Sequence, residues 1–455
     1  MISKENQQKV FDYIDTQLDR YIEELSELIR HRSMSVEGTG MLEGAEAVAA
    51  LVRKSGFEAD VHVQETGFPI VLGQTGDKKE KRYGVYGHYD VFPEGDKSQW
   101  ICDPYDPKVI DGKLYGRAST DDKGNLFINI KAAEAIKNVL GELPVDLAFL
   151  FEGEEEIGSK SLRGFLDQHM DHFGKLGGFI ASDRGWHESG RPCIYLGSKS
   201  NVTFKLTLRY GERNFHSGHA PLIPNPAWDL LHVLAKIRDA DGNILIPALK
   251  GKKIEPTDAD VKLLNTIPFD IEEYKATYGI DRILNEESGF AAARQLVFDA
   301  SCNINNFVAG TEEANGIVPG YATATVDMRL SGDYNPYEVC DSLVEYVKSL
   351  NPKIEITTFV THGYRASAEN EFVKNILEAA EQTTGDQPVT WPSWDGSGPL
   401  GILHRTFDIP ALIIGLGAPF TQAHTHSINE YIGLDNIIKG VKMMAGIYMT
   451  ALDKE

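Results

Sequence analysis

The feature of the sequence that most constrains its fold is an alternation of short apolar runs with longer amphipathic stretches between Ala45 and about Lys199. The apolar runs have the length and composition of buried strands, and the stretches between them show helical spacing of apolar residues. Strands that alternate with helices along a chain predict a mostly parallel sheet with helices on both faces. The predicted strands are RYGVYG, DLAFLF and GGFIAS, and the predicted helices include EGAEAVAALVRKSG and NLFINIKAAEAIKNVL.

The alternation changes character in the middle of the chain and then returns. The stretches SNVTFKLTLRYG and YATATVDMRL alternate apolar with polar residues, which is typical of half-exposed antiparallel strands. The sequence assigns no clear elements to residues 239–310. We therefore predict an α/β domain that is split into two parts by a smaller, inserted α+β domain. The predicted boundaries are 1–199 and 365–455 for the α/β domain and 200–364 for the insertion.

Composition limits the partners of this chain. Its 455 residues exceed what one simple core needs, which supports two domains. The formal net charge of −22 disfavours nucleic acid and anionic membranes as partners, because both require a positive footprint. Four widely spaced cysteines without a CxxC pair indicate neither a disulfide framework nor a zinc–thiolate site. The N-terminal stretch is polar and amphipathic and nothing reaches transmembrane length, so we expect a cytoplasmic protein.

Metal-binding side chains follow almost every predicted strand. The carboxyl ends of parallel strands meet at one edge of a sheet, where ligands bind. Histidine and carboxylate are the side chains that hold zinc, manganese or cobalt where thiolates are absent. A carboxylate can also bridge two metal ions, because it has two oxygens. The residues at these ends are His88 and Asp90, Asp121 and Asp122, Glu154 to Glu156, Asp183, and His424 and His426.

The stretch FEGEEEIGS (151–159) places four glutamates in five positions directly after an apolar run. A run of charge usually forms a solvated surface, and alone it would indicate a loop. Beside histidines and aspartates at neighbouring strand ends it suits a metal centre, because one glutamate could bind metal while its neighbour transfers a proton. Bound cations would also offset the repulsion among the carboxylates.

The motifs GHYDVFP, GRASTDDKG, EGEEEIGS, the segment around Asp183 and HSINE occur in this order. Together they resemble the M20 family of dinuclear zinc peptidases, which includes carnosinase-like dipeptidases, glutamate carboxypeptidases, aminoacylases and succinyl-diaminopimelate desuccinylases. The likeness covers nearly the whole chain. It implies two Zn²⁺ ions per subunit, with Mn²⁺ or Co²⁺ as substitutes. It also implies that the insertion is a dimerisation or lid domain, and that the protein is a homodimer.

The resemblance implies a set of metal ligands and one unusual bond. Two histidines occur in the AHTH stretch, and only the HSINE motif favours the second as a ligand. A strained cis peptide bond is implied directly after the bridging aspartate. The implied ligands are His88 and Asp183 for the first ion, Glu156 and His426 for the second, and Asp121 as the bridge.

The resemblance also implies roles for the neighbours of these ligands. Asp90 would orient His88. Glu155 would be the general base, because Glu155-Glu156-Ile157-Gly158-Ser159 matches the pair followed by x-Gly-Ser in the family. Glu152 and Glu154 are then expected to be solvated or to support the ligands. The implied substrate-binding residues are His216, which reaches a substrate carbonyl and often comes from the partner subunit, Asn315, Arg329 and Ser397.

The implied reaction is hydrolysis of a peptide bond, in a dipeptide or at a C-terminus, by a water between two zinc ions with Glu155 as base. The substrate would be a small peptide. An alternative within the family is a deacylase of N-acyl amino acids. A non-catalytic binding module is disfavoured, because all ligand positions and the base are filled. Serine catalysis is disfavoured too, because WDGSGPLG lacks the spacing of a nucleophile elbow.

Overall fold

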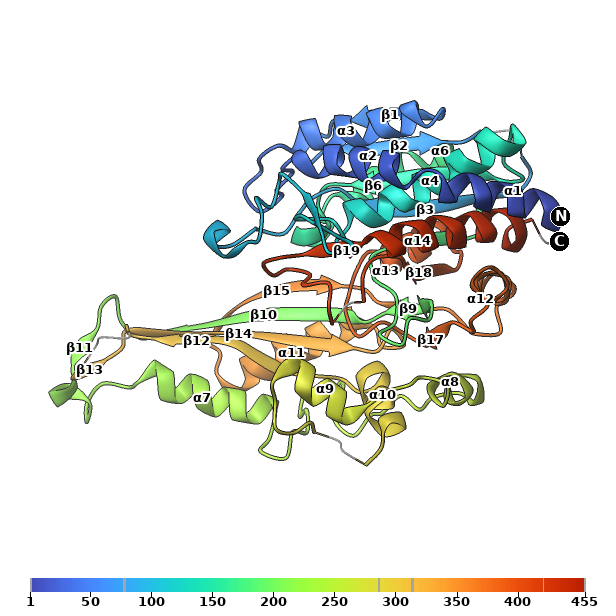
Figure 1. Cartoon of the computed structure of the whole chain (residues 1–455). Helices are drawn as coiled ribbons and strands as arrows, with labels where there is room; N and C mark the ends of the chain where they lie inside the picture. The colour runs from blue at the N-terminus through green and yellow to red at the C-terminus, as the bar shows by residue number, and fades with distance from the viewer. Residues whose placement is uncertain (1, 77–78, 285–286, 312–314, 420, 454–455) are drawn as a thin grey trace.

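Two β-sheets organise the chain in a computed structural model, which describes residues 2–76, 79–284, 287–311, 315–419 and 421–453. The larger sheet carries helices on both faces, and both chain termini lie beside it (Figure 1). The smaller sheet extends away from the larger one, with helices along one side. The predicted α/β class, with a mostly parallel main sheet and an inserted α+β part, is confirmed.

The larger sheet has eight strands in the order β1-β2-β6-β3-β7-β18-β8-β17. The central strands β6, β3, β7 and β18 are parallel, and β2 and β8 run antiparallel to them. Segments from both sides of the predicted insertion build the sheet, since β18 pairs with β7 and β8. The bounds are β1 Glu58–His62, β2 Ile70–Gln74, β3 Arg82–His88, β6 Asp146–Glu152, β7 Phe179–Ala181, β8 Cys193–Tyr195, β17 Val389–Trp391 and β18 Ala411–Gly415.

Alternating residues of the central strands face two separate cores. All seven residues of β6 are buried: Phe149 faces one core, and Leu150 faces the other. Burial on both faces explains why the strand is continuously apolar instead of alternating. The first core is covered by α1 Lys4–Asp15, α2 Leu18–Arg30, α3 Met41–Lys54, α4 Lys123–Leu140, α12 Glu371–Thr384 and α14 Leu434–Gly446, and the second by α5 Leu162–Gln168, α6 Met170–Phe173 and α13 Leu400–Phe407.

The smaller sheet is antiparallel, with the order β12-β14-β10-β15. Buried and partly exposed residues alternate along β10 and β14, because only one face of the sheet is covered. Two helices, α7 and α11, supply that cover and share a core with the sheet. The bounds are β10 Ser200–Arg209, β12 Asn303–Ala309, β14 Tyr321–Leu330, β15 Glu355–Thr361, α7 Pro226–Ile237 and α11 Pro336–Leu350.

Part of the segment that the sequence left unassigned packs against the larger sheet. Helices α8 (Asp258–Leu264), α9 (Ile271–Tyr278) and α10 (Gly289–Phe298) lie within it. Leu264 and Val297 share an apolar cluster with Cys193 of β8 and Val389 of β17. The insertion therefore contacts the edge of the sheet that it interrupts, and the domain boundaries at 199/200 and 364/365 stay predictions.

None of the described helices is long and apolar enough to cross a membrane. The cytoplasmic location stays a prediction.

The remaining elements are short. They are the sheet of β19 Tyr431–Gly433, β5 Lys113–Tyr115 and β4 Lys108–Ile110, the pairs β9 Gly197–Ser198 with β16 Tyr364–Arg365 and β11 Phe215–His216 with β13 Ile317–Val318, the 3₁₀ turns Lys97–Gln99, Glu155–Ile157 and Ser217–His219, and a π-helical turn Ile447–Ala451.

Substitutions of two neighbouring residues of β10 test whether packing on the covered face stabilises the smaller sheet. Phe204 is fully buried under the helices, and Lys205 beside it is exposed. We expect Phe204→Ala to lower the free energy of unfolding by about 3–5 kcal/mol, because it leaves a cavity in the core. Lys205→Ala should change it by less than about 0.5 kcal/mol. Denaturant unfolding followed by circular dichroism measures both, and equal effects would contradict this packing.

Candidate metal centre

The predicted ligands come together at the carboxyl ends of the central parallel strands. His88 is the last residue of β3, and Asp183 lies two residues beyond the end of β7. Glu155 and Glu156 begin the 3₁₀ turn that follows β6. Asp121 lies just before α4. Parallel strands bring their carboxyl ends to one edge of the sheet, so residues far apart in sequence meet there.

The ligand atoms form two groups that share Asp121. In one group, Nε2 of His88 lies 3.0 Å from Oδ1 of Asp121 and 3.9 Å from Oδ1 of Asp183. In the other, Nε2 of His426 lies 3.0 Å from Oδ2 of Asp121 and 3.0 Å from Oε2 of Glu156. Within each group the ligand atoms lie within 4.8 Å of one another. The two oxygens of Asp121 thus face different histidines, as a bridging carboxylate requires.

Asp90 connects two of the strand ends. Its carboxylate lies 3.2 Å from Nδ1 of His88, on the side of the ring away from Asp121. The same carboxylate accepts hydrogen bonds from the backbone N–H groups of Glu155 and Glu156, at 3.2 and 3.0 Å. Asp90 is fully buried, so these contacts orient the imidazole and position the glutamate turn together.

Glu430 holds the loop that carries Asp121, a role that the sequence did not predict. Its side chain is fully buried and forms an ion pair with Arg117, with 2.7 Å between Nη1 and Oε2. It also accepts backbone hydrogen bonds from Ala118, Thr120 and Asp121, at 2.9 to 3.0 Å. The only indication in the sequence was the position of Glu430 at the end of HSINE, the motif that begins with the ligand His426. The implied cis peptide bond at Asp121–Asp122 is present.

The other two glutamates of FEGEEEIGS are buried and structural. Glu152 accepts hydrogen bonds from the hydroxyls of Tyr86, at 2.6 Å, and Ser159, at 2.8 Å. Glu154 accepts from the backbone N–H groups of Phe68 and Ser161, at 3.2 and 2.8 Å. The expectation that they support the site fits these contacts, whereas solvation does not. The four glutamates divide into two that build the loop and two that face the ligand cluster.

The cluster has an excess of buried negative charge. Burial and the charge of Asp121 raise the pKa of Glu156 to about 7 and that of Asp183 to about 6. Burial also raises the pKa of Glu155 well above its ordinary value. For His426, burial alone would lower the pKa, but its hydrogen bonds to Asp121 and Glu156 raise it to about 10. This donor set fits divalent cations, because their charge would relieve the repulsion among the carboxylates.

A cavity of about 290 Å³ opens beside the cluster, and two predicted substrate residues line it. Arg329 of β14 donates a hydrogen bond from Nη1 to Oγ of Ser397, at 2.9 Å. Glu155, Asp121 and His426 line the same cavity. Because Arg329 belongs to the smaller sheet, the cavity is formed between the two parts of the chain.

The other predicted substrate residues lie elsewhere. His216 is in β11, at the end of the smaller sheet remote from the larger one (Figure 1), and Asn315 is exposed just before β13. Neither lines the cavity of its own chain. His424 is exposed and contacts the carbonyl of Ile428, so the geometry favours His426 as the ligand. The ring of His426 stacks on Phe92, with 4.1 Å between centroids.

Comparisons with known proteins agree with this geometry. The human Beta-Ala-His dipeptidase is 26% identical over 97% of this chain and 92% of its own length. The Cys-Gly metallodipeptidase of Candida albicans is 27% identical over 96% of both chains. The structure of an M20 family metallo-carboxypeptidase from Sulfolobus solfataricus has a TM-score of 0.90 at 28% identity, over 95% of this chain and 99% of its own. Human carnosine dipeptidase 1 shares the fold, with a TM-score of 0.80 at 24% identity, over 98% and 99%.

The fold and the histidine–carboxylate cluster define a metal-dependent hydrolase of the peptidase class. The profile of peptidase family M20/M25/M40 matches residues 84–450, which include every predicted ligand. The chain belongs to this family. Membership agrees with the resemblance that the motifs indicated and implies that the protein binds divalent metal.

A substitution of Glu430 tests whether a residue that positions the ligand Asp121 contributes to metal affinity. Glu430→Gln removes the charge that pairs with buried Arg117 and weakens the hold on the loop of Asp121. We expect metal affinity to fall roughly 10–100-fold, because groups that position ligands contribute that much to binding. Asp435→Asn, on the exposed surface of α14, should leave the affinity unchanged. Competition with a chelator measures both, and unchanged affinity in Glu430→Gln would refute this role.

The perturbed pKa values give a pH dependence. Glu156, Asp183 and His426 all have folded pKa values above their ordinary ones, so the folded protein retains protons that the unfolded chain has lost. The metal-free protein should therefore lose stability as pH rises from about 4 to about 10. Metal binds the deprotonated ligands, so its affinity should rise over the lower part of that range. Thermal unfolding in chelator and in excess metal tests this, and a metal-free melting temperature that rises with pH would contradict it.

Proposed function

We propose that this protein is a dipeptidase that binds two divalent metal ions, with zinc as the first candidate. The observation that carries the proposal is the position of Asp121, whose two oxygens face the ligand groups of His88 and His426. Such a pair of ions, when bound, supplies polarisation of the scissile carbonyl and a water of lowered pKa. His88, Asp121 and Asp183 would hold one ion, and Asp121, Glu156 and His426 the other.

Glu155 is the general base in this proposal. It lines the cavity beside the ligands but belongs to neither ligand group. Its carboxylate would take a proton from the attacking water and deliver it to the leaving amine. The positive charge of the bound ions would lower its raised pKa towards the range in which a base works. Asp90 would hold this turn and the imidazole of His88 in fixed positions relative to each other.

Arg329 and Ser397 would recognise the C-terminal carboxylate of the substrate. Arg329 presents a planar guanidinium at the cavity wall, which suits a carboxylate. Its hydrogen bond to Ser397 orients it there. A cavity of about 290 Å³ suits a short substrate, and several relatives are dipeptidases by name.

His216 and Asn315 would act on the cavity of a second subunit. The edge strand β12 leaves Ile304 and Val308 50% and 41% exposed, and the neighbouring α7 leaves Trp228 62% exposed. Within the described residues the outer edge of β12 pairs with no strand, and such an edge beside exposed apolar side chains suits association with a second copy of the chain. A homodimer formed through this surface would give the remote tip of the smaller sheet a place beside a partner's cavity, where His216 would contact the substrate carbonyl.

Two glutamate substitutions, one in the turn at the site and one remote from it, test the proposed mechanism. With metal bound, we expect Glu155→Gln to lower kcat by at least about 10²–10⁴-fold, because the proton transfer is lost. Glu142→Gln, just before the opposite end of β6 and with its side chain 77% exposed, should retain most activity. The assay is mass spectrometry on dipeptides, tripeptides and N-acyl amino acids with and without added zinc or manganese. Normal turnover by Glu155→Gln would refute its role, and cleavage of N-acyl amino acids alone would identify a deacylase instead.

A further inference from the structure

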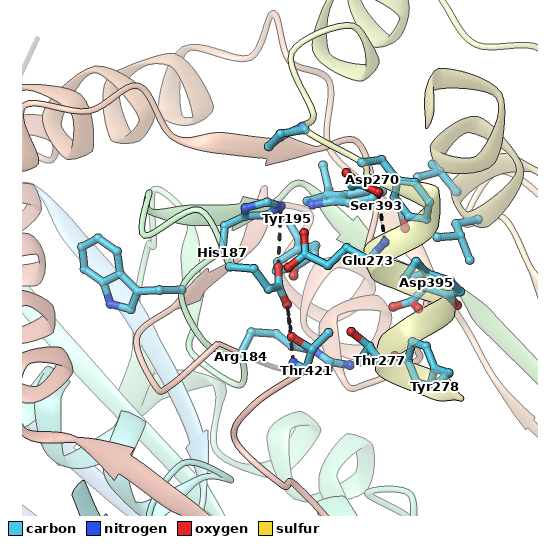
Figure 2. Close-up of a pocket in the computed structure, with 18 residues that line it drawn as sticks. Arg184, His187, Tyr195, Asp270, Glu273, Thr277, Tyr278, Ser393, Asp395 and Thr421 are labelled. Carbon is cyan, nitrogen blue, oxygen red and sulfur yellow. Dashed lines mark hydrogen bonds and ion pairs between the residues drawn. The ribbon is translucent and has the colours of Figure 1, made fainter. Parts of the chain in front are cut away.

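A second cavity, of about 150 Å³, lies between α9 and the segments 184–195 and 391–395 (Figure 2). We call it the acidic pocket. Figure 2 shows Glu273, Thr277 and Tyr278 of α9 on one side and Arg184 and His187 across from them. The pocket contains none of the predicted metal ligands. It is built where the unassigned segment 239–310 packs on the edge of the larger sheet.

A chain of aromatic rings lines this pocket. The centroid distances are 6.5 Å from Tyr195 to Trp391, 6.4 Å from Trp391 to Phe269, 5.2 Å from Phe269 to Tyr274 and 4.8 Å from Tyr274 to Tyr278. Tyr278, at the end of the series, is 51% exposed. Aromatic faces of this kind attract organic cations through the negative charge above the ring.

The charges around the rings are mostly negative. Glu188 receives a hydrogen bond from Thr421, at 2.8 Å, and Asp270 caps the N-terminus of α9. Glu273 and Asp395 also line the pocket, and within the part of the chain that the structure describes neither carboxylate makes a hydrogen bond or ion pair. Burial together with the charges of Asp395 and Glu188 raises the pKa of Tyr278. The field inside the pocket is therefore negative, and two carboxylates are available to a ligand.

The basic groups at the pocket do not cancel this field. Burial lowers the pKa of His187, which favours the neutral form of its imidazole. The guanidinium of Arg184 lies 3.9 Å from the ring centroid of Trp394, which lines the metal cavity. Among the lining residues, the one cationic side chain of Arg184 thus stands against four carboxylates, those of Glu188, Asp270, Glu273 and Asp395. Lys199, outside the lining, also interacts electrostatically with Asp395.

The acidic pocket and the metal cavity share two walls. Ser393 and Asp395 line the pocket, while Trp394 and Ser397 of the same stretch line the metal cavity. Arg184, next to the ligand Asp183, lines both. The two cavities are therefore adjacent, which would let one group of a bound substrate extend from the metal cavity to the pocket. The negative field of the pocket would exclude the C-terminal carboxylate of the substrate, which Arg329 would bind instead. The group that enters the pocket would therefore belong to the N-terminal residue of the substrate.

We propose that the acidic pocket is a specificity subsite that takes a cationic side chain, an ammonium or a guanidinium, from the N-terminal residue of the substrate. The inference rests on the proposed dipeptidase function and deepens it. Glu273 and Asp395 would pair with the cation, and the rings of Tyr274 and Tyr278 would contact its alkyl stem and charge. These residues select the substrate and take no part in the reaction.

The test compares substrates that differ only in side-chain charge, with the metal-loaded full-length protein. Lysyl-glycine, norleucyl-glycine and ε-N-acetyl-lysyl-glycine all keep the α-ammonium group, and only the first carries a side-chain cation. We expect kcat/KM for lysyl-glycine to exceed that for the other two by about tenfold, which corresponds to one partly exposed cation contact. Glycyl-lysine against glycyl-norleucine should show no such preference.

Glu273→Gln and Asp395→Asn, together, should reduce the preference for lysyl-glycine over norleucyl-glycine to near unity. Glu272→Gln is the matched control, because Glu272 is on the same helix, its side chain is 82% exposed and it pairs with Lys275 outside the pocket. That control should keep the preference. A parent protein that cleaves norleucyl-glycine without favouring lysyl-glycine would overturn the subsite, as would a preference that survives the double substitution. Failure to cleave any dipeptide would instead refute the proposed function.

Discussion

The carboxylate of Asp121 is the group on which the rest of the site depends. It lies 3.0 Å from His88 through one oxygen and 3.0 Å from His426 through the other. These histidines come from segments more than three hundred residues apart in the sequence, so one buried anion joins the two ends of a split domain. An isolated buried anion costs free energy of folding. Here two imidazoles lie against the carboxylate of Asp121, and Glu430 accepts a hydrogen bond from the backbone N–H of Asp121.

The parallel sheet explains why so much charge can be gathered at one place. Each central strand is buried on both faces and ends at the same edge, so the polar residue that follows it has only that edge to occupy. Asp90 and Glu430 then hold the loops at that edge through backbone hydrogen bonds. The carboxylates that remain repel one another, and this repulsion is what makes the cluster selective for cations.

The inserted part of the chain completes the cavity and extends it. Arg329 reaches the metal cavity from the smaller sheet, while α9 closes the acidic pocket against the edge of the larger one. In the proposed function, both parts of the chain would contact the substrate. Arg329 and Glu273 belong to the insertion, whereas Ser397 and Asp395 belong to the part of the chain that follows it.

The sequence by itself determined the class of fold, the family and the ligand motifs, because apolar periodicity and short motifs are local properties. It predicted His88, Asp121, Glu156, Asp183 and His426, and the structure brings these five side chains together. It did not identify Glu430 as the clamp, the buried state of Glu152 and Glu154, or the packing of α8 to α10 on the large sheet. Only the tertiary structure decided these, and the acidic pocket with them. They depend on contacts between segments far apart in the chain, for which a single sequence carries no periodic signal.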